Sequence, residues 1–169
     1  MTSGITDDPN DPGIKRGPPD ETPVPMHDAY VVLSAEERAK GFVRPVRRSY
    51  RHVGIAGPSH PLRDLTEEDR QRWGADLYVK YEQYPPDTHG AADHRMSRTV
   101  LGKLWTKAQL DSVGKGCGTV TTMGTELAET YARNPGFYGA TYCCGCSMHR
   151  EVGAAGEFVW EGTNERVGT

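Results

Sequence analysis

The sequence predicts an α+β fold: a small domain with short antiparallel strands and two to four short helices, preceded by a disordered N-terminal arm. Three observations lead to this class. The segments that alternate between apolar and polar residues are short, as in small sheets. Capping residues precede several short helical stretches. The 169 residues include 20 glycines and 12 prolines, a share well above the sum of about 12 per cent in ordinary chains, which indicates many turns.

Residues 1–29 are predicted to form the arm. This segment is acidic and contains six prolines: Pro9, Pro12, Pro18, Pro19, Pro23 and Pro25. Such a composition buries too little apolar surface to offset the entropy of ordering the chain. The alternative is an extended arm that binds a partner. The remaining residues, 30–169, are expected to form a single domain.

The first elements of that domain are expected before residue 54. Ser34 and Glu37 have the spacing of a capping box, which predicts a helix over 35–40. Residues 42–53 alternate in part and are rich in valine, aromatic residues and arginine. They are predicted to form a strand that Pro45 interrupts, because proline cannot donate to a sheet ladder.

The middle of the chain is expected to hold short elements joined by polar loops. Thr66 and Thr106 each precede a helical pattern and can cap it with a side-chain oxygen. The expected elements are a helix at 67–73, a strand at 77–84, a polar loop at 85–97, a strand at 100–105 and a helix at 107–113.

The last third contains the clearest helical pattern, at 123–134, which ends before Pro135. Three apolar residues share one face of this helix: Leu127, Ala128 and Tyr131. Strands are expected at 137–142 and 157–160, on the two sides of a cysteine-rich turn.

Charge and hydropathy narrow the class of protein. The net charge of −3 provides no general attraction to nucleic acid or membranes. No apolar run approaches the length of about 18 residues that a membrane span needs, and the N-terminus lacks the features of a signal peptide. We therefore expect a cytosolic protein, in which the four cysteines are metal ligands or free thiols rather than disulfides.

The cysteines are spaced as metal ligands. Cys143 and Cys146 form a C-x-x-C turn, and His149 follows three residues later. Cys117 lies in a second turn, between glycines. Zinc takes four ligands in a tetrahedron, and three cysteines with one histidine are a common structural set. The sequence thus predicts a structural zinc ion bound by Cys117, Cys143, Cys146 and His149, in the C-terminal portion at about 114–160.

Alternatives remain open at this site. Free buried thiols or a redox dithiol are the competing interpretations, although the motif does not open a helix after a strand as redox motifs do. Cys144 adjoins Cys143 and is expected to point away from the metal, with Cys144 and Cys146 as an alternative pair. The fourth ligand can also come from another histidine: His52, His60, His89 or His94. The sequence has a His-x-Glu at His149-Arg150-Glu151, but it follows the cysteines, whereas the zinc-deaminase pattern has it before them. This order argues against that pattern, and we expect a protein that is not an enzyme.

A basic stretch without acidic residues precedes the metal motifs. It contains Arg44, Arg47, Arg48 and Arg51, together with Tyr50, and this composition is suited to a phosphate backbone and a stacked base. The competing interpretation is a solvated edge strand whose charges prevent aggregation, or a strand that pairs with the acidic arm.

The segments after Gly114 resemble a family of small uncharacterised proteins of tailed bacteriophages and prophages. The resemblance lies in GKGCGTVTTMGTELAETYARNPGFYGATYCCGCSMHREV, FVWEGTNERVG and the basic GFVRPVRRSYRHVG, and covers most of residues 40–169. It implies no known activity. It implies that the C-x-x-C pair and the following histidine are the fixed elements, that Cys144 is less typical, and that the protein is expressed in the cytoplasm of a bacterial host.

Three classes of function follow from these observations. We expect a non-enzymatic, zinc-stabilised phage protein that acts as an intracellular interaction module and binds a host or phage protein. The alternative is a nucleic-acid or nucleotide-binding protein that uses the stretch from Arg44 to His52. A zinc-dependent enzyme is the third class.

Overall fold

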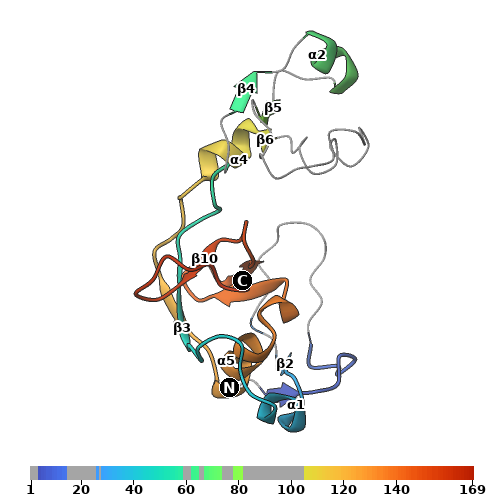
Figure 1. Ribbon diagram of the computed structural model, residues 1–169, viewed down its shortest axis with the longest axis vertical. Coiled ribbons are helices and arrows are strands. Elements are labelled where there is room, and N and C mark those ends of the chain that lie inside the picture. The colour runs from blue at the N-terminus through green and yellow to red at the C-terminus, as the bar shows by residue number, and fades with distance from the viewer. Residues whose placement is uncertain are drawn as a thin grey trace. The chain divides into compact units, whose positions relative to one another are not determined.

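The computed structural model describes residues 4–14, 26, 28–58, 62–64, 67–73, 78–81 and 105–169 (Figure 1). The chain divides into two compact units, one of residues 1–56 and 114–169 (unit 1) and one of residues 57–113 (unit 2). The sequence analysis expected a single domain at 30–169, whereas the structure inserts unit 2 between the two halves of unit 1. The structure confirms the predicted α+β class, with short antiparallel strands and short helices.

The central sheet of unit 1 has three antiparallel strands in the order β10–β3–β7. Strand β3 (Ser49–His52) pairs with β10 (Phe158–Trp160) on one side and with β7 (Val120–Thr122) on the other. The sequence pattern placed a longer strand at 42–53. Before Ser49, however, the backbone N–H groups of Val43 and Arg44 donate to the carbonyl of Ala132 and not to a neighbouring strand.

A hairpin carries two of the cysteines. Strand β8 (Ala140–Cys143) pairs with β9 (Met148–Glu151), and the four residues between them form the turn. Ser147 has φ 55°, the only positive φ outside glycine among the described residues, and it lets the chain reverse at this point. The expected strand at 137–142 therefore begins later, after the short 3₁₀ turn Pro135–Phe137 (η2).

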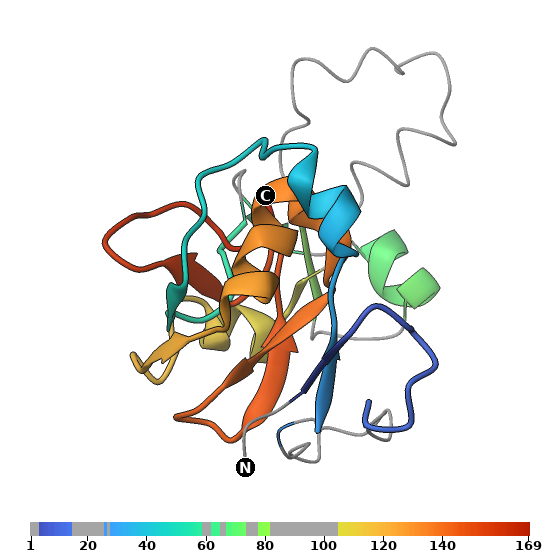
Figure 2. The same cartoon turned by 90° about the horizontal axis from the view of Figure 1, so that it is seen from below.

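Two helices cover unit 1. Helix α1 (Ala35–Ala39) begins at the predicted cap, where the Ser34 hydroxyl accepts from the backbone N–H of Glu37. Helix α5 (Thr125–Arg133) matches the strongest helical pattern and buries Ala128 and Tyr131. The two helices lie side by side (Figure 2), joined by ion pairs from Arg38 to Glu129 and from Arg133 to Glu37.

The core of unit 1 lies between the sheet, the hairpin and α5. Its buried members are Tyr50, Met123, Ala128, Tyr131, Cys143, Phe158, Trp160 and Val167. Aromatic rings meet edge to face, at 5.2 Å between Tyr50 and Phe158 and 5.6 Å between Tyr131 and Trp160. Because Cys143 belongs to this core, the cysteine turn is anchored in the most buried part of the unit.

Part of the predicted arm carries described structure. Strand β1 (Gly4–Thr6) pairs in parallel with β2 (Ala29–Val31), in a two-stranded sheet that the sequence pattern did not indicate. Turns in residues 8–14 bring the chain back, where the Gly13 carbonyl accepts from the N–H groups of Asp28 and Ala29.

Unit 2 has its own antiparallel sheet, in the order β4–β5–β6. The strands are Leu62–Asp64 (β4), Tyr78–Tyr81 (β5) and Trp105–Thr106 (β6), and the helices are Glu67–Trp73 (α2) and Lys107–Ser112 (α4). The expected cap Thr106 forms a complete capping box with Gln109. Thr66, the loop at 85–97 and residues 100–104 lie outside the described residues. No helix in the described part of the chain has the length and apolar character needed to cross a membrane.

Candidate metal centre

Four side chains from three segments of unit 1 converge on one point. His52, Cys117, Cys143 and Cys146 each offer one ligand atom, and these atoms all lie within 4.8 Å of one another. The Nδ1 atom of His52 lies 3.2 Å from the sulfur of Cys117, 3.3 Å from that of Cys146 and 3.7 Å from that of Cys143. The sulfurs of Cys117 and Cys143 are 3.5 Å apart. None of the cysteines forms a disulfide, and the group can hold a metal ion.

The strand pattern explains why His52 points inward. Alternate residues of a strand face the same side, so His52 shares a face with Tyr50, which belongs to the core. His52 is only 3 % exposed, and its ring lies 5.1 Å from that of Phe158. The alternation of Ser49, Tyr50, Arg51 and His52 in the sequence is the signal that could have placed this histidine inside.

A close crossing of two backbone segments brings Cys117 to His52. A Cβ atom on Gly116 would lie 2.5 Å from the backbone nitrogen of Gly54 and also against the His52 carbonyl, so only glycine fits at this position. The backbone N–H of Cys117 donates to the Nδ1 atom of His52 at 3.3 Å. Gly116 therefore serves the approach of two chain segments, whereas Gly118 has a positive φ of 74° and no close neighbour.

Gly145 has a similar role in the turn of the hairpin. The positive φ in this turn belongs to Ser147 and not to Gly145. A Cβ atom on Gly145 would lie 2.7 Å from the Cβ of Thr119 and 2.9 Å from the sulfur of Cys117. The missing side chain thus leaves room for the Cys117 segment to reach the C-x-x-C turn.

Glu157 orients the histidine from the opposite side. Its Oε2 atom lies 2.7 Å from Nε2 of His52, and both side chains are largely buried. If Nδ1 binds a metal, Nε2 carries the proton and donates to this carboxylate. A carboxylate in this position fixes the ring and raises the basicity of the ligand nitrogen. Arg150 approaches the other oxygen of Glu157 at 3.7 Å.

The three thiols differ in acidity in the absence of a metal. Burial opposes ionisation of Cys117, but hydrogen bonds with Thr119 and His52 outweigh it and lower the pKa of Cys117 to about 6. Burial raises the pKa of Cys143 to about 12, and burial with the neighbouring Cys117 raises the pKa of Cys146. A cation bound at the centre would favour the thiolate form of all three cysteines, because a coordinated thiol is deprotonated.

Two residues of the sequence motif lie outside the group. His149, the expected fourth ligand, faces Tyr142 across the hairpin, with ring centroids 5.3 Å apart, and His52 takes its place in the cluster. Cys144 is exposed and accepts a hydrogen bond from Thr121, so it points away from the cluster as expected. His60, His89 and His94 lie outside the described residues.

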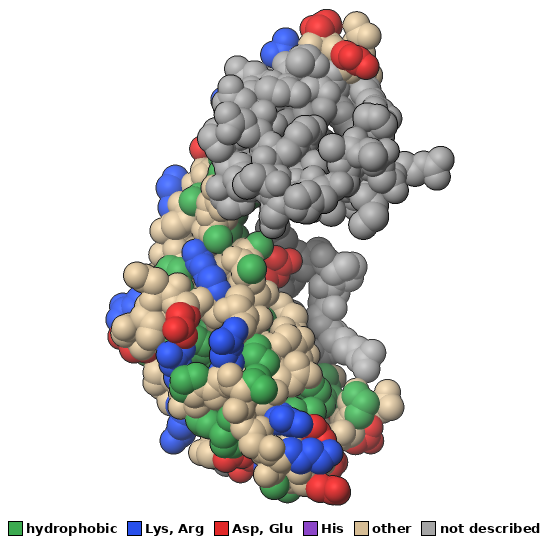
Figure 3. All heavy atoms as spheres, in the orientation of Figure 1, with side chains coloured by type: hydrophobic (Ala, Val, Ile, Leu, Met, Phe, Trp, Pro, Cys, Tyr) green, Lys and Arg blue, Asp and Glu red, His purple; other side chains and the backbone are tan. Residues whose placement is uncertain are grey.

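The four arginines of the basic stretch make contacts within unit 1. Arg51 binds both carboxylate oxygens of Glu161 and the carbonyl of Gly118. Arg47 pairs with Glu165, while Arg44 and Arg48 donate to the carbonyls of Thr169 and Met123. On the face in Figure 3, basic and acidic side chains are interspersed over the described residues.

Comparisons of the chain with protein-family models, with curated proteins and with solved structures found no match. What the centre can do therefore follows from its donor set. Thiolate and imidazole donors suit zinc and other transition metals, whereas calcium and magnesium prefer oxygen. With four protein donors around one point, a tetrahedral ion has no position left for water or substrate.

Proposed function

We propose that His52, Cys117, Cys143 and Cys146 bind a structural zinc ion, and that the chain is a non-enzymatic binding module stabilised by this ion. The spacing of the donor atoms carries the proposal. Two donors of a tetrahedral zinc ion are about 3.5 to 3.8 Å apart, given bond lengths of about 2.0 to 2.3 Å. The separations of 3.2 to 3.7 Å between the His52 nitrogen and the sulfurs, and of 3.5 Å between two sulfurs, are close to this requirement.

A structural role fits both the site and the fold. Catalytic zinc ions keep one position open, whereas all four donors here come from the protein. Glu157 is engaged with His52 and so is not placed as a free general base. The core of unit 1 is small, and small folds gain much of their stability from a bound metal.

An exposed apolar loop supports the binding role. Residues 41–48 connect α1 to β3 and include Phe42, Val43 and Val46, with exposed fractions of 47 %, 62 % and 41 %. Large apolar side chains that gather on a surface mark sites of protein interaction. The neighbouring arginines already contact groups within unit 1, and this favours a protein over nucleic acid as the partner. The resemblance to phage proteins supports a host or phage protein in the bacterial cytoplasm.

Metal content tests the zinc site directly. Protein purified without chelator should contain about one equivalent of zinc, as a site with four protein donors requires. Cys146→Ser and His52→Ala should lose it. Cys144→Ser lies in the same turn but outside the cluster and should retain it. Less than half an equivalent in the wild-type protein, or equal zinc in Cys144→Ser and Cys146→Ser, contradicts the assignment.

Comparative capture from bacterial cytosol tests the binding role. The zinc-loaded protein should retain a protein partner that the Phe42→Ser, Val43→Ser double variant loses. Val120→Ser removes another exposed apolar side chain of unit 1 and should bind like the wild type. The alternative outcome is that the protein retains material that nuclease digests and salt releases, and that no captured protein requires Phe42 and Val43. This result would instead identify a nucleic-acid binder.

A further inference from the structure

Unit 1 contains a cavity that the metal centre does not use. It has a volume of about 310 Å³, at the lower end of the range for small-molecule sites. Five tyrosines contribute to its lining: Tyr30, Tyr50, Tyr131, Tyr138 and Tyr142. Met26 and Met123 add thioethers, which make favourable contacts with aromatic rings. The walls therefore suit a flat aromatic molecule.

The lining is uncharged. None of the 15 lining residues among those described is an aspartate, glutamate, lysine, arginine or histidine. A charged ligand would lose its hydration without gaining a partner of opposite charge, which is costly in an apolar site. Polar contacts come from hydroxyl groups, including those of Thr121 and Thr141, so the cavity selects for a neutral ligand.

The hydroxyls of Tyr50 and Tyr138 form hydrogen bonds within the protein. Tyr50 donates to the carbonyl of Tyr142 and accepts from Thr141, and Tyr138 donates to the carbonyl of Val31. The hydroxyl of Tyr131 differs, because it is buried and no described residue meets it in hydrogen-bonding geometry. Burial raises the pKa of Tyr131, and the nearby Thr141 hydroxyl offsets this only in part. The residue as a whole is only 3 % exposed.

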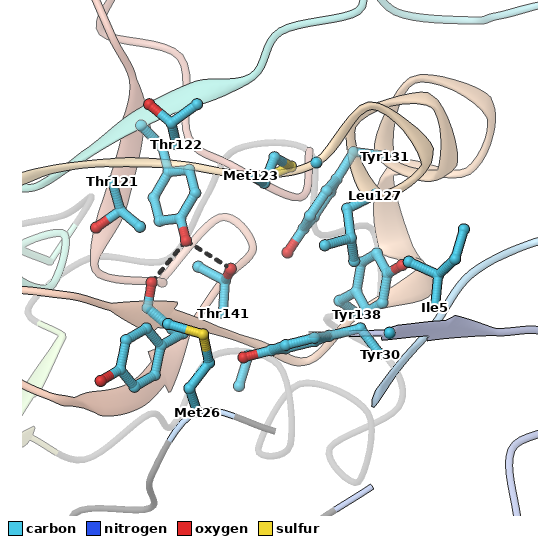
Figure 4. Close-up of a pocket in the computed structure, with 15 residues that line it drawn as sticks. Ile5, Met26, Tyr30, Thr121, Thr122, Met123, Leu127, Tyr131, Tyr138 and Thr141 are labelled. Carbon is cyan, nitrogen blue, oxygen red and sulfur yellow. Dashed lines mark hydrogen bonds between the residues drawn. The ribbon is translucent and has the colours of Figure 1, made fainter. Parts of the chain in front are cut away.

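The Tyr131 hydroxyl is directed into the cavity, toward the side of Thr141 (Figure 4). A buried hydroxyl without a partner is destabilising, and an acceptor placed in the cavity would remove this cost. The orphan donor therefore marks the point where a ligand would place its polar atom.

We propose that this cavity binds a neutral aromatic molecule of one or two fused rings that carries a hydrogen-bond acceptor, to which the Tyr131 hydroxyl donates. The tyrosine rings and thioethers contact the faces and edges of the ligand. Exposed apolar side chains at Ile5 and Met26 border the cavity and offer a route of entry without charge. This site is separate from the loop at 41–48 and does not depend on the proposed protein partner.

Quinoline is a suitable probe, since it is neutral near pH 7, has two fused rings and carries one acceptor nitrogen. The full-length, zinc-loaded protein is titrated with quinoline, with naphthalene, which lacks the acceptor, and with 2-naphthoate, which is anionic. Saturation-transfer NMR and calorimetry report binding. Quinoline should bind saturably and at least about tenfold more tightly than 2-naphthoate, because the cavity offers no counter-charge.

Tyr131→Phe removes the donor and keeps the ring. It should weaken quinoline about 3- to 10-fold, as loss of one hydrogen bond predicts, and leave naphthalene unchanged. The same variant should raise the urea midpoint of the unliganded protein, because the orphan hydroxyl is gone. A structural role for Tyr131 alone would not produce these opposite effects. Equal quinoline affinity in Tyr131→Phe and wild type overturns the assignment of the donor.

Leu127→Trp fills the cavity from α5 and should abolish binding of both neutral probes. Zinc content measured on the same sample shows whether Leu127→Trp is folded. If Leu127→Trp does not fold, the Tyr131→Phe variant tests the proposal on its own. Absence of saturable quinoline binding to a zinc-loaded wild-type protein overturns the proposal while leaving the zinc site intact. Quinoline binding that folded Leu127→Trp does not affect also overturns it, because the ligand then lies elsewhere.

Discussion

Replacing Gly145 by alanine should weaken zinc binding without removing a ligand. The added Cβ would lie 2.7 Å from the Cβ of Thr119 and 2.9 Å from the sulfur of Cys117. Ordinary contacts begin near 3.4 Å, so the sulfur must retreat by about 0.5 Å, which exceeds the tolerance of about 0.2 Å in zinc–ligand distances. The strain falls on Cys117 and on the segment that carries Thr119.

The magnitude follows from the cost of overpacking. An extra methyl group in a tightly packed site costs about 1 to 3 kcal/mol. If the holo protein bears this cost and the metal-free protein relaxes, zinc affinity falls about 5- to 150-fold, since 1.4 kcal/mol corresponds to a factor of ten. Competition with a chromophoric chelator measures the change.

Gly136→Ala provides the matched control. A Cβ atom at Gly136 meets nothing within 4 Å, and the residue does not have a positive φ. It should bind zinc like the wild type. Substituted Co²⁺ should show altered thiolate-to-metal charge-transfer absorption in Gly145→Ala only. Unchanged affinity and an unchanged spectrum in Gly145→Ala would refute the close approach of the two turns.

Three further results are expected. Glu157→Gln removes the charge beside His52 and should reduce zinc affinity about ten- to a hundredfold in the same competition assay. Glu151→Gln, on the exposed end of β9, should leave the affinity unchanged. Equal affinities in the two variants would contradict the orienting role of Glu157. An excess of chelator should lower the thermal midpoint of the wild type but not that of Cys146→Ser, because only the former has zinc to lose; an identical shift in both would contradict stabilisation by the metal. Hydrogen bonds from Lys40 and then Arg133 lower the pKa of Glu37 below its ordinary value of 4.5. These contacts therefore stabilise the fold fully at a pH above 4.5, and the stabilisation is lost as the pH falls through the pKa of Glu37 in the folded state. The difference in thermal midpoint between wild type and Glu37→Gln should therefore be present at neutral pH and shrink below pH 4.5; a difference that grows in acid would contradict the sign.

Local sequence signals predicted the helices well. Ser34 and Thr106 mark helix beginnings through groups that act within one turn, so no tertiary information is needed. The strands were harder to predict. Strand β7 was missed because its threonines resemble a polar loop, and its pairing with β3 joins residues about seventy positions apart. The insertion of unit 2 between paired strands is a long-range feature of the same kind.

The candidate site was predicted only in part, because local spacing identifies ligands within one turn but not ligands from distant segments. Cys143 and Cys146 are brought together by their own turn, which the C-x-x-C spacing encodes. The nearby His149 satisfied the same spacing rule but lies on β9, where the alternation of the hairpin turns it toward Tyr142. His52 is 65 residues from Cys117, and its approach depends on the crossing at Gly54 and Gly116, which no local pattern encodes.

The choice of His52 over His149 changes what a bound metal would connect. With His149, the ion would join residues 117–149 and would tie together only the second half of unit 1. With His52, it joins strand β3 to the cysteine turns and links the two chain segments that flank residues 57–113. Doubling the length of the closed loop adds only about 0.6 kcal/mol of loop-closure entropy, so loop length is not the main difference. The larger effect is that the central strand, with Tyr50 and His52 on one face, is fastened to the hairpin that carries Tyr142 and Cys143. The candidate metal centre and the tyrosine cavity thus share two supporting strands, so an ion bound at the centre would hold the cavity walls in position.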